Sequence, residues 1–288
     1  MNTVFSLHQV GYRAGNKEIL RNISFEVKEG DVFALLGHNG SGKSSLINII
    51  FNDILPQTGE VKRTKISREH YHNIGVVFDK SVIFPMLKLK ELVHYYSVIY
   101  DKDYREKGME YAAAFDLQDS WNTCFYKLSA GERRKTLIML ALLHNPGILI
   151  MDEPFSNLDP VIADKIWSYI AIPGRTIFFT AHDWDFAFRH ASQICFLHKG
   201  SMLHFPGSPS DYMAVLPAPT KIVTPYKKEI EELLNGNEYY INDDKISFFA
   251  ADFKPYLKGI QAHTRNFSLL DADIRDVYML MLKKHAHA

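Results

Sequence analysis

Residues 31–46, DVFALLGHNGSGKSSL, join a short apolar run to a glycine-rich loop and then to a helical stretch. The loop satisfies the pattern GxxxxGK[ST] from Gly37 to Ser44. At average residue frequencies, the four fixed positions would coincide by chance in a chain of this length on the order of one per cent of the time. Glycines let backbone N–H groups close around phosphate oxygens, and the helix adds its positive N-terminal end. The stretch therefore predicts a phosphate-binding loop.

This loop predicts a nucleotide ligand, and we expect ATP together with Mg²⁺. Lys43 would contact the β- and γ-phosphates, which makes it an expected catalytic residue, and Ser44 would bind the metal. A plain glycine-rich turn is the alternative, which the flanking strand and helix disfavour. The expected nucleotide-binding residues of the loop are Gly37, His38, Asn39, Gly40, Ser41, Gly42, Lys43, Ser44 and Ser45.

A second motif, GILIMDEPFSNLDP at residues 147–160, delivers two adjacent carboxylates to the end of another apolar run. Asp152 would hold Mg²⁺, directly or through water, and Glu153 would polarise the attacking water as the catalytic base. Without a phosphate-binding loop, adjacent acids after a strand are often a solvated turn. With the loop present, a metal and catalytic site is the better interpretation.

Short, continuous apolar runs recur along the chain, at residues 31–36, 75–78, 147–151, 176–180 and 193–197. Such runs indicate strands buried on both faces, which favours an α/β core with a largely parallel sheet. Residues 19–30 instead alternate apolar and polar side chains and end at a Glu29-Gly30 turn. That alternation predicts an antiparallel strand, belonging to an N-terminal β subdomain.

The pattern of elements divides the chain into a large ATPase domain, a linker and a small C-terminal domain. Helical spacing dominates residues 80–143, which we interpret as a helical subdomain inserted into the large domain of residues 1–209. Residues 215–225, VLPAPTKIVTP, are rich in proline, so residues 210–225 are expected to form a linker. The remaining residues 226–288 predict a small α+β domain with a helix at 228–236, a hairpin around 239–249 and a final helix.

That final helix is expected to carry an apolar stripe. Leu270, Ile274, Val277 and Met281 would lie on one face of it, where ordinary core packing is the simplest explanation.

Charge and composition narrow the class of partner. The 288 residues contain 33 Lys plus Arg and 33 Asp plus Glu, so no overall basic field exists to attract nucleic acid, and none is expected as a partner. No stretch of eighteen apolar residues occurs, and we expect that the chain does not itself cross a membrane. Cys124 and Cys195 lie far apart, which fits a reducing cytosol.

Several further motifs follow in a fixed order: LSAGE at residues 128–132, SNLDP at 156–160 and TAHDWDF at 180–186. Together with the two motifs above, they make residues 5–209 resemble the ATP-binding subunit of an ABC transporter, nearest to drug and bacteriocin export cassettes. A P-loop NTPase core is the fold that this resemblance implies. Tyr12, in VGYRAG, occupies the position where the family stacks an aromatic ring on adenine.

By this resemblance, His182 would reach the γ-phosphate as a catalytic residue, while Ser129 and Gly131 would contact the nucleotide of a partner subunit. Asp159 would also contact that subunit across the dimer. Asp79 stands where the family usually has Gln; it could ligate Mg²⁺ or act only as a turn residue.

The LSAGE motif has a local interpretation as well. Ser129 and Glu132 have the spacing of a capping box, with Ala130 and Glu132 in place of the family's Gly and Gln. Arg133, Arg134 and Lys135 are interpreted either as screening charges or as a solvated face.

The resemblance implies two ATPase subunits, identical or different, that close around two ATP molecules and drive transport through membrane subunits in separate chains. We expect export, and a peripheral location on the cytoplasmic face of the membrane. A soluble mechanical ATPase acting on ribosomes or DNA is the first alternative. A P-loop kinase is the second, but it would leave LSAGE and His182 unexplained.

Overall fold

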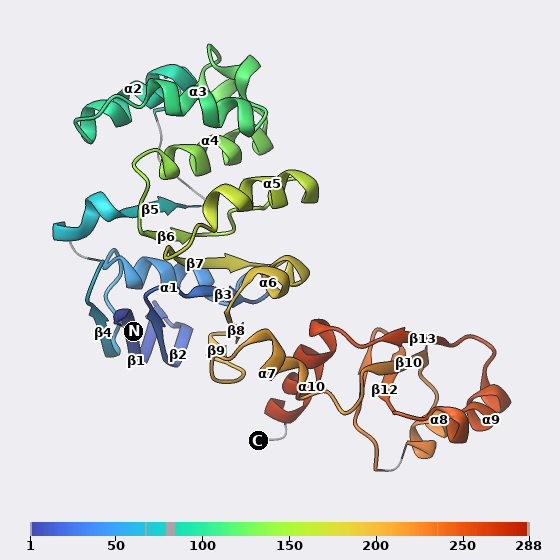
Figure 1. Ribbon diagram of the computed structural model, residues 1–288. Helices are drawn as coiled ribbons and strands as arrows, with labels where there is room; N and C mark the ends of the chain where they lie inside the picture. The colour runs from blue at the N-terminus through green and yellow to red at the C-terminus, as the bar shows by residue number, and fades with distance from the viewer. Residues whose placement is uncertain (1, 67, 79–83, 235, 287–288) are drawn as a thin grey trace.

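A computed structural model describes residues 2–66, 68–78, 84–234 and 236–286 (Figure 1). The chain forms a layered α/β body, with a helical insertion on one side and a C-terminal unit that projects from the other. Asp79, an expected metal ligand, lies outside the described residues. The described residues form three sheets, and the arrangement of these sheets determines where the sequence motifs lie.

The central sheet has six strands in the order β5-β6-β7-β3-β8-β9. All its pairs are parallel except that of β8 with the short β9, so the predicted parallel core is confirmed. The strands are β3 (Val32–Leu36), β5 (Ile74–Val77), β6 (Ile148–Met151), β7 (Thr176–Ala181), β8 (Gln193–His198) and β9 (Ser201–Met202). Strands β6, β7 and β3 are consecutive in the sheet and parallel. The phosphate loop after β3 and the acidic motif after β6 therefore lie at the same edge of the sheet.

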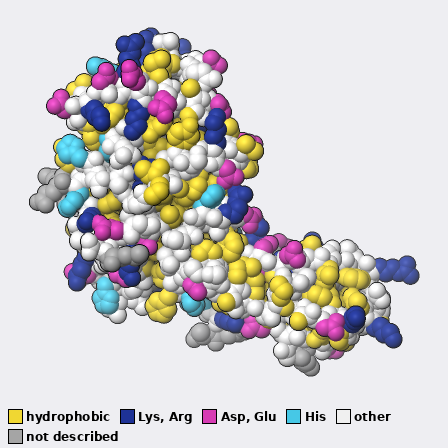
Figure 2. All heavy atoms as spheres, in the orientation of Figure 1, with side chains coloured by type: hydrophobic (Ala, Val, Ile, Leu, Met, Phe, Trp, Pro, Cys, Tyr) yellow, Lys and Arg dark blue, Asp and Glu magenta, His cyan; other side chains and the backbone are white. Residues whose placement is uncertain are grey.

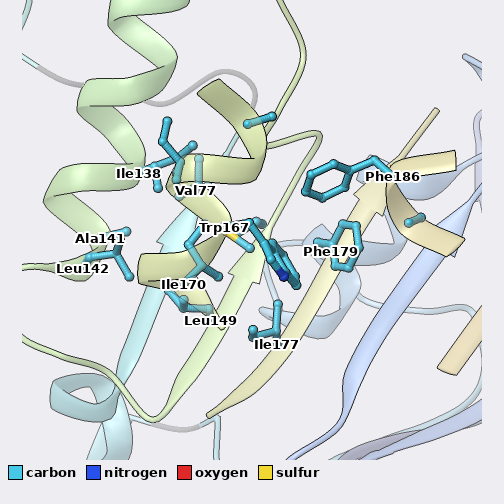
Figure 3. Close-up of a cluster of buried hydrophobic side chains, with 14 of the residues drawn as sticks. Val77, Ile138, Ala141, Leu142, Leu149, Trp167, Ile170, Ile177, Phe179 and Phe186 are labelled. Carbon is cyan, nitrogen blue, oxygen red and sulfur yellow. The ribbon is translucent and has the colours of Figure 1, made fainter. Parts of the chain in front are cut away.

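Apolar residues along β6 alternate between two buried layers. Leu149 and Met151 belong to the core under the helices, and Ile148 and Ile150 belong to the core on the opposite face. This explains why the central strands are continuous apolar runs. The helices over the first face are α4 (Ala130–Leu142) and α5 (Pro160–Ile170). Figure 3 shows the ring of Trp167 beside that of Phe179, with Ile170 and Leu149 packed around them.

The opposite face is covered by helix α1 (Lys43–Ile50) and by an antiparallel sheet in the order β2-β1-β4. Its strands are β1 (Thr3–Ala14), β2 (Lys17–Lys28) and β4 (Thr58–Arg63). Phe25 of β2 stacks on Phe33 and Phe178 of the central sheet at ring distances of 5.1 and 6.2 Å. The predicted N-terminal antiparallel β subdomain is therefore present, and aromatic packing joins it to the core.

The predicted helical insertion is present among the described residues, where its first helix begins at Leu89, and it precedes the second nucleotide motif. It contains α2 (Leu89–Ile99), α3 (Arg105–Ala114) and the beginning of α4, with short 3₁₀ turns η2 (Gln118–Ser120) and η3 (Phe125–Lys127); another 3₁₀ turn, η1 (Arg68–Asn73), precedes β5. Helix α6 (Trp184–His190) follows β7, and the short α7 (Pro209–Met213) follows β9. Figure 2 shows acidic and basic side chains interspersed over the visible face of the molecule.

The C-terminal unit is built on a four-stranded antiparallel sheet in the order β11-β12-β10-β13. Its elements are β10 (Thr220–Pro225), α8 (Lys228–Leu233), β11 (Tyr239–Asn242), β12 (Lys245–Phe249), α9 (Lys254–His263) and β13 (Ser268–Asp271). The predicted hairpin and the helix at its start are confirmed. Its core contains Ile222, Ile246 and Phe248.

The expectation of a linker over residues 210–225 is wrong for its last part, because residues 220–225 form an inner strand of this sheet. Pro219 precedes the strand and Pro225 is its last residue, so neither proline lies in the interior of the strand. Thr220, Ile222, Val223 and Thr224 between them are β-branched residues that favour a strand. The small C-terminal domain thus begins before residue 226.

The final helix, α10 (Ile274–Ala286), packs back onto the large domain. Ile274, Val277 and Met281 lie in its main core as the predicted stripe requires. Leu270 does not, because it belongs to edge strand β13 and is 47% exposed. The stripe therefore starts at the first turn of the helix.

Candidate nucleotide-binding site

The phosphate-binding loop leaves β3 and enters α1 with a backbone that needs glycine. Gly42 has φ 111° as the residue before α1, a conformation that other residues rarely adopt. At Gly37, an added Cβ would lie 2.4 Å from the carbonyl oxygen of Leu197 and 2.6 Å from Ser41 Oγ. The loop is therefore held close against β8, and its glycines are required by geometry.

Lys43 begins α1 and points back into the loop. Its side chain is buried, and Nζ donates hydrogen bonds to the carbonyl oxygens of Gly37 at 2.8 Å and His38 at 3.3 Å. Nζ also lies 3.3 Å from Oε1 of Glu153. The ammonium group is thus held against backbone carbonyls and a carboxylate, from which it can turn to an anion that binds at the mouth of the loop.

The start of α1 has the features of an anion site. No side chain caps it, and no acidic residue lies in its first turn. Its first N–H groups lack partners within the helix. The Oγ of Ser41 is buried with no hydrogen-bond partner among the described atoms. These donors fit a phosphate group, which is negatively charged and would accept from them.

A hollow of about 410 Å³ lies at this end of the helix. From the predicted set, it is lined by Asn39, Gly40, Gly42, Lys43, Ser44, Ser45, Asp152 and Glu153; Lys17 and Ile19 complete the lining. The structure therefore brings the two sequence motifs to one place. The hydroxyl of Ser44 and the carboxylate of Asp152 are hard oxygen donors of the type that Mg²⁺ prefers, so they fit this metal together with phosphate oxygens.

Asp152 and Glu153 are oriented by Thr180, a residue to which the sequence motifs gave no role. The hydroxyl of Thr180, at the end of β7, donates to Oδ1 of buried Asp152 at 2.5 Å, and it accepts the N–H of Glu153 at 2.9 Å. Glu153 has φ 47°, which turns the chain sharply after β6. The signal for Thr180 in the sequence was a hydroxyl residue at the end of the apolar run 176–180. This run forms the strand beside the one that the two acids follow.

His182 lies on the other side of Glu153. Its Nδ1 is 3.5 Å from Oε2 of Glu153, and its side chain is 53% exposed. Glu153 therefore stands between the ammonium group of Lys43 and the imidazole of His182. This places the three predicted catalytic residues together at the mouth of the phosphate loop.

Arg134 corrects an expectation about the LSAGE segment. It is neither a screening charge nor a solvated residue, since only 6% of it is exposed. Its guanidinium donates to the carbonyl oxygen of Asp152 at 3.4 Å and to Ser156 Oγ at 3.1 Å. An arginine inside α4 thus ties this helix to the loop that follows β6.

Ser129 begins α4 with the predicted capping box. Its Oγ accepts the N–H of Glu132 at 3.2 Å, and the Glu132 carboxylate accepts the N–H of Ser129 at 2.9 Å. The hydroxyl of Ser120 donates to the same carboxylate and, with these bonds, holds the pKa of Glu132 below its ordinary value. The cap of this helix is therefore confirmed.

The hollow is not lined by the predicted residues Gly37, His38, Ser41 and His182, nor by Ser129, Gly131, Asp159 and Tyr12. Ser129 is exposed, and a Cβ on Gly131 would lie 3.3 Å from the carbonyl oxygen of Asn157. Asp159 caps α5 by accepting the N–H of Val161 at 2.9 Å. Tyr12 lines a separate hollow with residues of β2 and β4, and it pairs across the strands with Leu20, whose side chain lies against Gly42 of the phosphate loop. Ser129, Gly131, Asp159 and Tyr12 need a second subunit or a bound base to take up their expected roles.

A strand that enters a GxxxxGK[ST] loop, a metal-type carboxylate and an adjacent glutamate define this chain as a P-loop nucleoside triphosphatase. The ABC transporter family model matches residues 20–156. The chain is 30% identical to the ABC transporter ATP-binding protein MJ1023 of Methanocaldococcus jannaschii, over 66% of this chain and 72% of that one. It therefore belongs to the family of ABC transporter ATP-binding proteins.

Two further comparisons describe the likeness. The chain is 37% identical to human ATP-binding cassette sub-family A member 6, over 52% of this chain but only 9% of that much longer protein. It also resembles a solved dimeric structure of the ATP-binding cassette MJ0796 in a post-hydrolysis state with ADP and Pi. The TM-score is 0.62 and the identity 25%, over 71% of this chain and 98% of that one. Among the described residues, no helix is long and apolar enough to span a membrane.

Proposed function

We propose that this chain is the subunit that binds and hydrolyses ATP in an ABC transporter, and that it works with Mg²⁺. The observation that carries this proposal is the position of Glu153 between Lys43 and His182, at the mouth of the phosphate loop. A carboxylate held there can accept a proton from water as that water attacks the terminal phosphate. Bound Mg²⁺ would supply charge neutralisation on the phosphate oxygens.

The residues divide the work according to their contacts. Lys43 exchanges the carbonyl oxygens of Gly37 and His38 for phosphate oxygens. Asp152, fixed by Thr180, and Ser44 hold the metal. His182 orients Glu153 and donates to the terminal phosphate. Since Lys43 is already dehydrated and aimed into the loop, little reorganisation is needed when the nucleotide arrives.

We propose that two such subunits, identical or different, close around two ATP molecules. Support comes from α4, whose exposed N-terminus with Ser129 and Gly131 lies outside its own phosphate hollow. The likeness to a dimeric cassette points the same way. A helix N-terminus stabilises a facing anion by about 0.3 to 1 kcal/mol, and up to about 2 when partly buried.

The membrane subunits are proposed to be separate chains that dock on the helical insertion. Phe84, Met86 and Tyr95 are exposed there by 55%, 69% and 40%, an apolar surface next to the start of α2. This arrangement would hold the ATPase on the cytoplasmic face of the membrane. Export is the proposed direction, supported by the resemblance of residues 5–209 to drug and bacteriocin export cassettes.

The central test compares the parent protein with Glu153→Gln. The parent should hydrolyse ATP in a Mg²⁺-dependent way, and the variant should lose about 10²- to 10⁴-fold in kcat while still binding ATP. Unchanged hydrolysis in the variant would overturn the role of Glu153. Purification with ribosomes, and without any membrane protein, would favour a soluble mechanical ATPase.

A further inference from the structure

Tyr278 of α10 reaches from the C-terminal unit into the neighbourhood of the nucleotide site. The residue is 2% exposed. Its ring centroid lies 4.6 Å from that of Trp184, 5.3 Å from Phe196 and 5.4 Å from His38. The core stripe of α10 accounts for its burial, but it does not require contact with a residue of the phosphate loop.

His38 and Trp184, two of the aromatic residues that Tyr278 contacts, are also in contact with each other. The rings of His38 and Trp184 lie 5.3 Å apart. His38 is part of the phosphate loop, and its carbonyl oxygen accepts from Lys43. Trp184 is the first residue of α6, two positions after His182. The triangle of His38, Trp184 and Tyr278 therefore joins the phosphate loop to the segment that carries the catalytic histidine.

Polar contacts fix Tyr278 and its helix in this position. The Tyr278 hydroxyl lies 2.7 Å from Nδ1 of His198 on β8. One turn earlier, Arg275 donates to Oδ2 of Asp185 on α6 at 2.6 Å. These two contacts hold α10 against β8 and α6 of the large domain.

The same helix is anchored in the C-terminal sheet. Nζ of Lys221, on β10, lies 2.7 Å from both carboxylate oxygens of Asp276, which is fully buried. A displacement of the sheet is thus transmitted to α10, because breaking a buried ion pair is costly. Tyr278 lies two residues beyond Asp276 and moves with it.

We propose that Tyr278 is a positioning residue for ATP hydrolysis, through which the C-terminal unit sets the geometry of the phosphate loop and of His182. This inference rests on the proposed ATPase function of the site. The ring of Tyr278 packs against His38 and Trp184 and limits their movement. The C-terminal unit is then a control element of nucleotide turnover, in addition to any role as an attached domain.

The test compares Tyr278→Leu, Tyr278→Phe and a matched control, all in the full chain. Leu280→Ala is the control, because Leu280 is equally buried on α10 but packs against Ala218 and Phe249 of the C-terminal unit. Amide hydrogen exchange of residues 37–43 and 182–186 is measured without nucleotide. The Kd for ATP and the kcat and KM of hydrolysis are measured separately.

Tyr278→Leu should speed exchange in both segments and lower kcat by roughly 10-fold, since small misplacements at a catalytic site are costly. Tyr278→Phe keeps the ring and loses only the hydroxyl contact with His198, so it should recover most of the parental exchange rate and kcat. Leu280→Ala should lower thermal stability without either effect. Parental exchange and kcat in Tyr278→Leu, or the same losses in Leu280→Ala, would overturn the inference. If the parent lacks ATPase activity, the proposed function fails, whereas exchange and the Kd for ATP still decide the role of Tyr278.

Discussion

The hydroxyl of Thr180 donates a hydrogen bond to the buried carboxylate of Asp152 across two neighbouring strands, at 2.5 Å. The same hydroxyl accepts the N–H of Glu153. One side chain therefore fixes both acids of the motif: the carboxylate of one and the backbone of the other. Thr180 touches neither the proposed metal nor the proposed nucleotide, and it acts by orienting groups that do.

Thr180→Val should therefore reduce ATP hydrolysis by about 10- to 100-fold, the usual cost of losing a supporting partner of a metal ligand. Valine has nearly the same shape but leaves Asp152 without its donor. Unfolding should also become easier, by about 1 to 3 kcal/mol, because a buried charged acceptor loses its hydrogen bond. Steady-state kinetics over a Mg²⁺ titration measure the first effect, and urea denaturation measures the second.

Thr180→Ser is the matched control, because it keeps the hydroxyl and removes only a methyl group. Its activity and Mg²⁺ dependence should remain near those of the parent. Equal losses in the valine and serine variants would show that the methyl group, and thus packing, is what matters at this position.

Thr180 also illustrates what the sequence could and could not predict. Five central strands were predictable because each is a short apolar run; four of them are buried on both faces, and the edge strand β5 alternates half-buried and buried residues. The phosphate loop was predictable because its glycines and lysine are fixed by backbone geometry. The partner of Asp152 was not, since the pairing of β6 with β7 is a long-range contact. Arg134 was misjudged for the same reason, because only tertiary packing buries it.

Ser129 allows the helix cap to be separated from the proposed contact between subunits. Ser129→Ala should cost about 1 kcal/mol of stability through the lost cap. Ser129→Arg should cost a similar amount, but it also places a bulky side chain at the exposed end of α4. In a Glu153→Gln background, the arginine variant should therefore fail to dimerise with ATP, as measured by analytical ultracentrifugation.

The control for this prediction is Ser208, which caps α7 with a capping box of the same kind. Ser208→Arg should leave ATP-dependent dimerisation intact. If Ser129→Arg dimerises like the parent, Ser129 is a helix cap and has no role at a subunit contact.

The buried ion pair between Lys221 and Asp276 predicts a strong dependence of the C-terminal unit on both partners. Lys221→Met should destabilise the fold by about 3 to 5 kcal/mol, because it leaves the Asp276 carboxylate buried and unpaired. Adding Asp276→Asn removes that charge and should recover part of the loss. The two variants are compared by thermal and urea unfolding; a double variant no more stable than the single one would contradict this explanation.

Residues 220–225 show why this unit was delimited wrongly from the sequence. Proline content suggested a linker, but the prolines mark the ends of the strand that carries Lys221. The register that pairs this strand with β12 and β13 is specified by the alternation of buried residues such as Ile222 and Thr224. Six residues are too few for that alternation to outweigh the proline signal.

His144 predicts how stability changes with acidity. Its ring stacks on Tyr100 at 4.3 Å, its Nε2 lies 3.1 Å from the carbonyl oxygen of Ile74, and burial lowers its pKa to about 4. In the unfolded chain the pKa is about 6.5. Below about pH 6.5, the unfolded chain therefore binds a proton that the folded chain does not bind until about pH 4, so acidification through this window favours unfolding.

At pH 5 the loss relative to pH 7 should be about 1 kcal/mol, a figure reduced to allow for the partial exposure of the ring. His144→Phe keeps a stacking ring but cannot titrate. Its free energy of unfolding should be lower at both pH values, because the carbonyl of Ile74 loses its partner, yet the drop from pH 7 to pH 5 should be smaller by that amount. His8→Gln, at an exposed position on β1, should keep the parental drop. If the free energy of unfolding falls equally from pH 7 to pH 5 in the parent and in His144→Phe, another group causes the acid sensitivity. A smaller fall in His144→Phe assigns this sensitivity to the imidazole of His144, which folding keeps neutral.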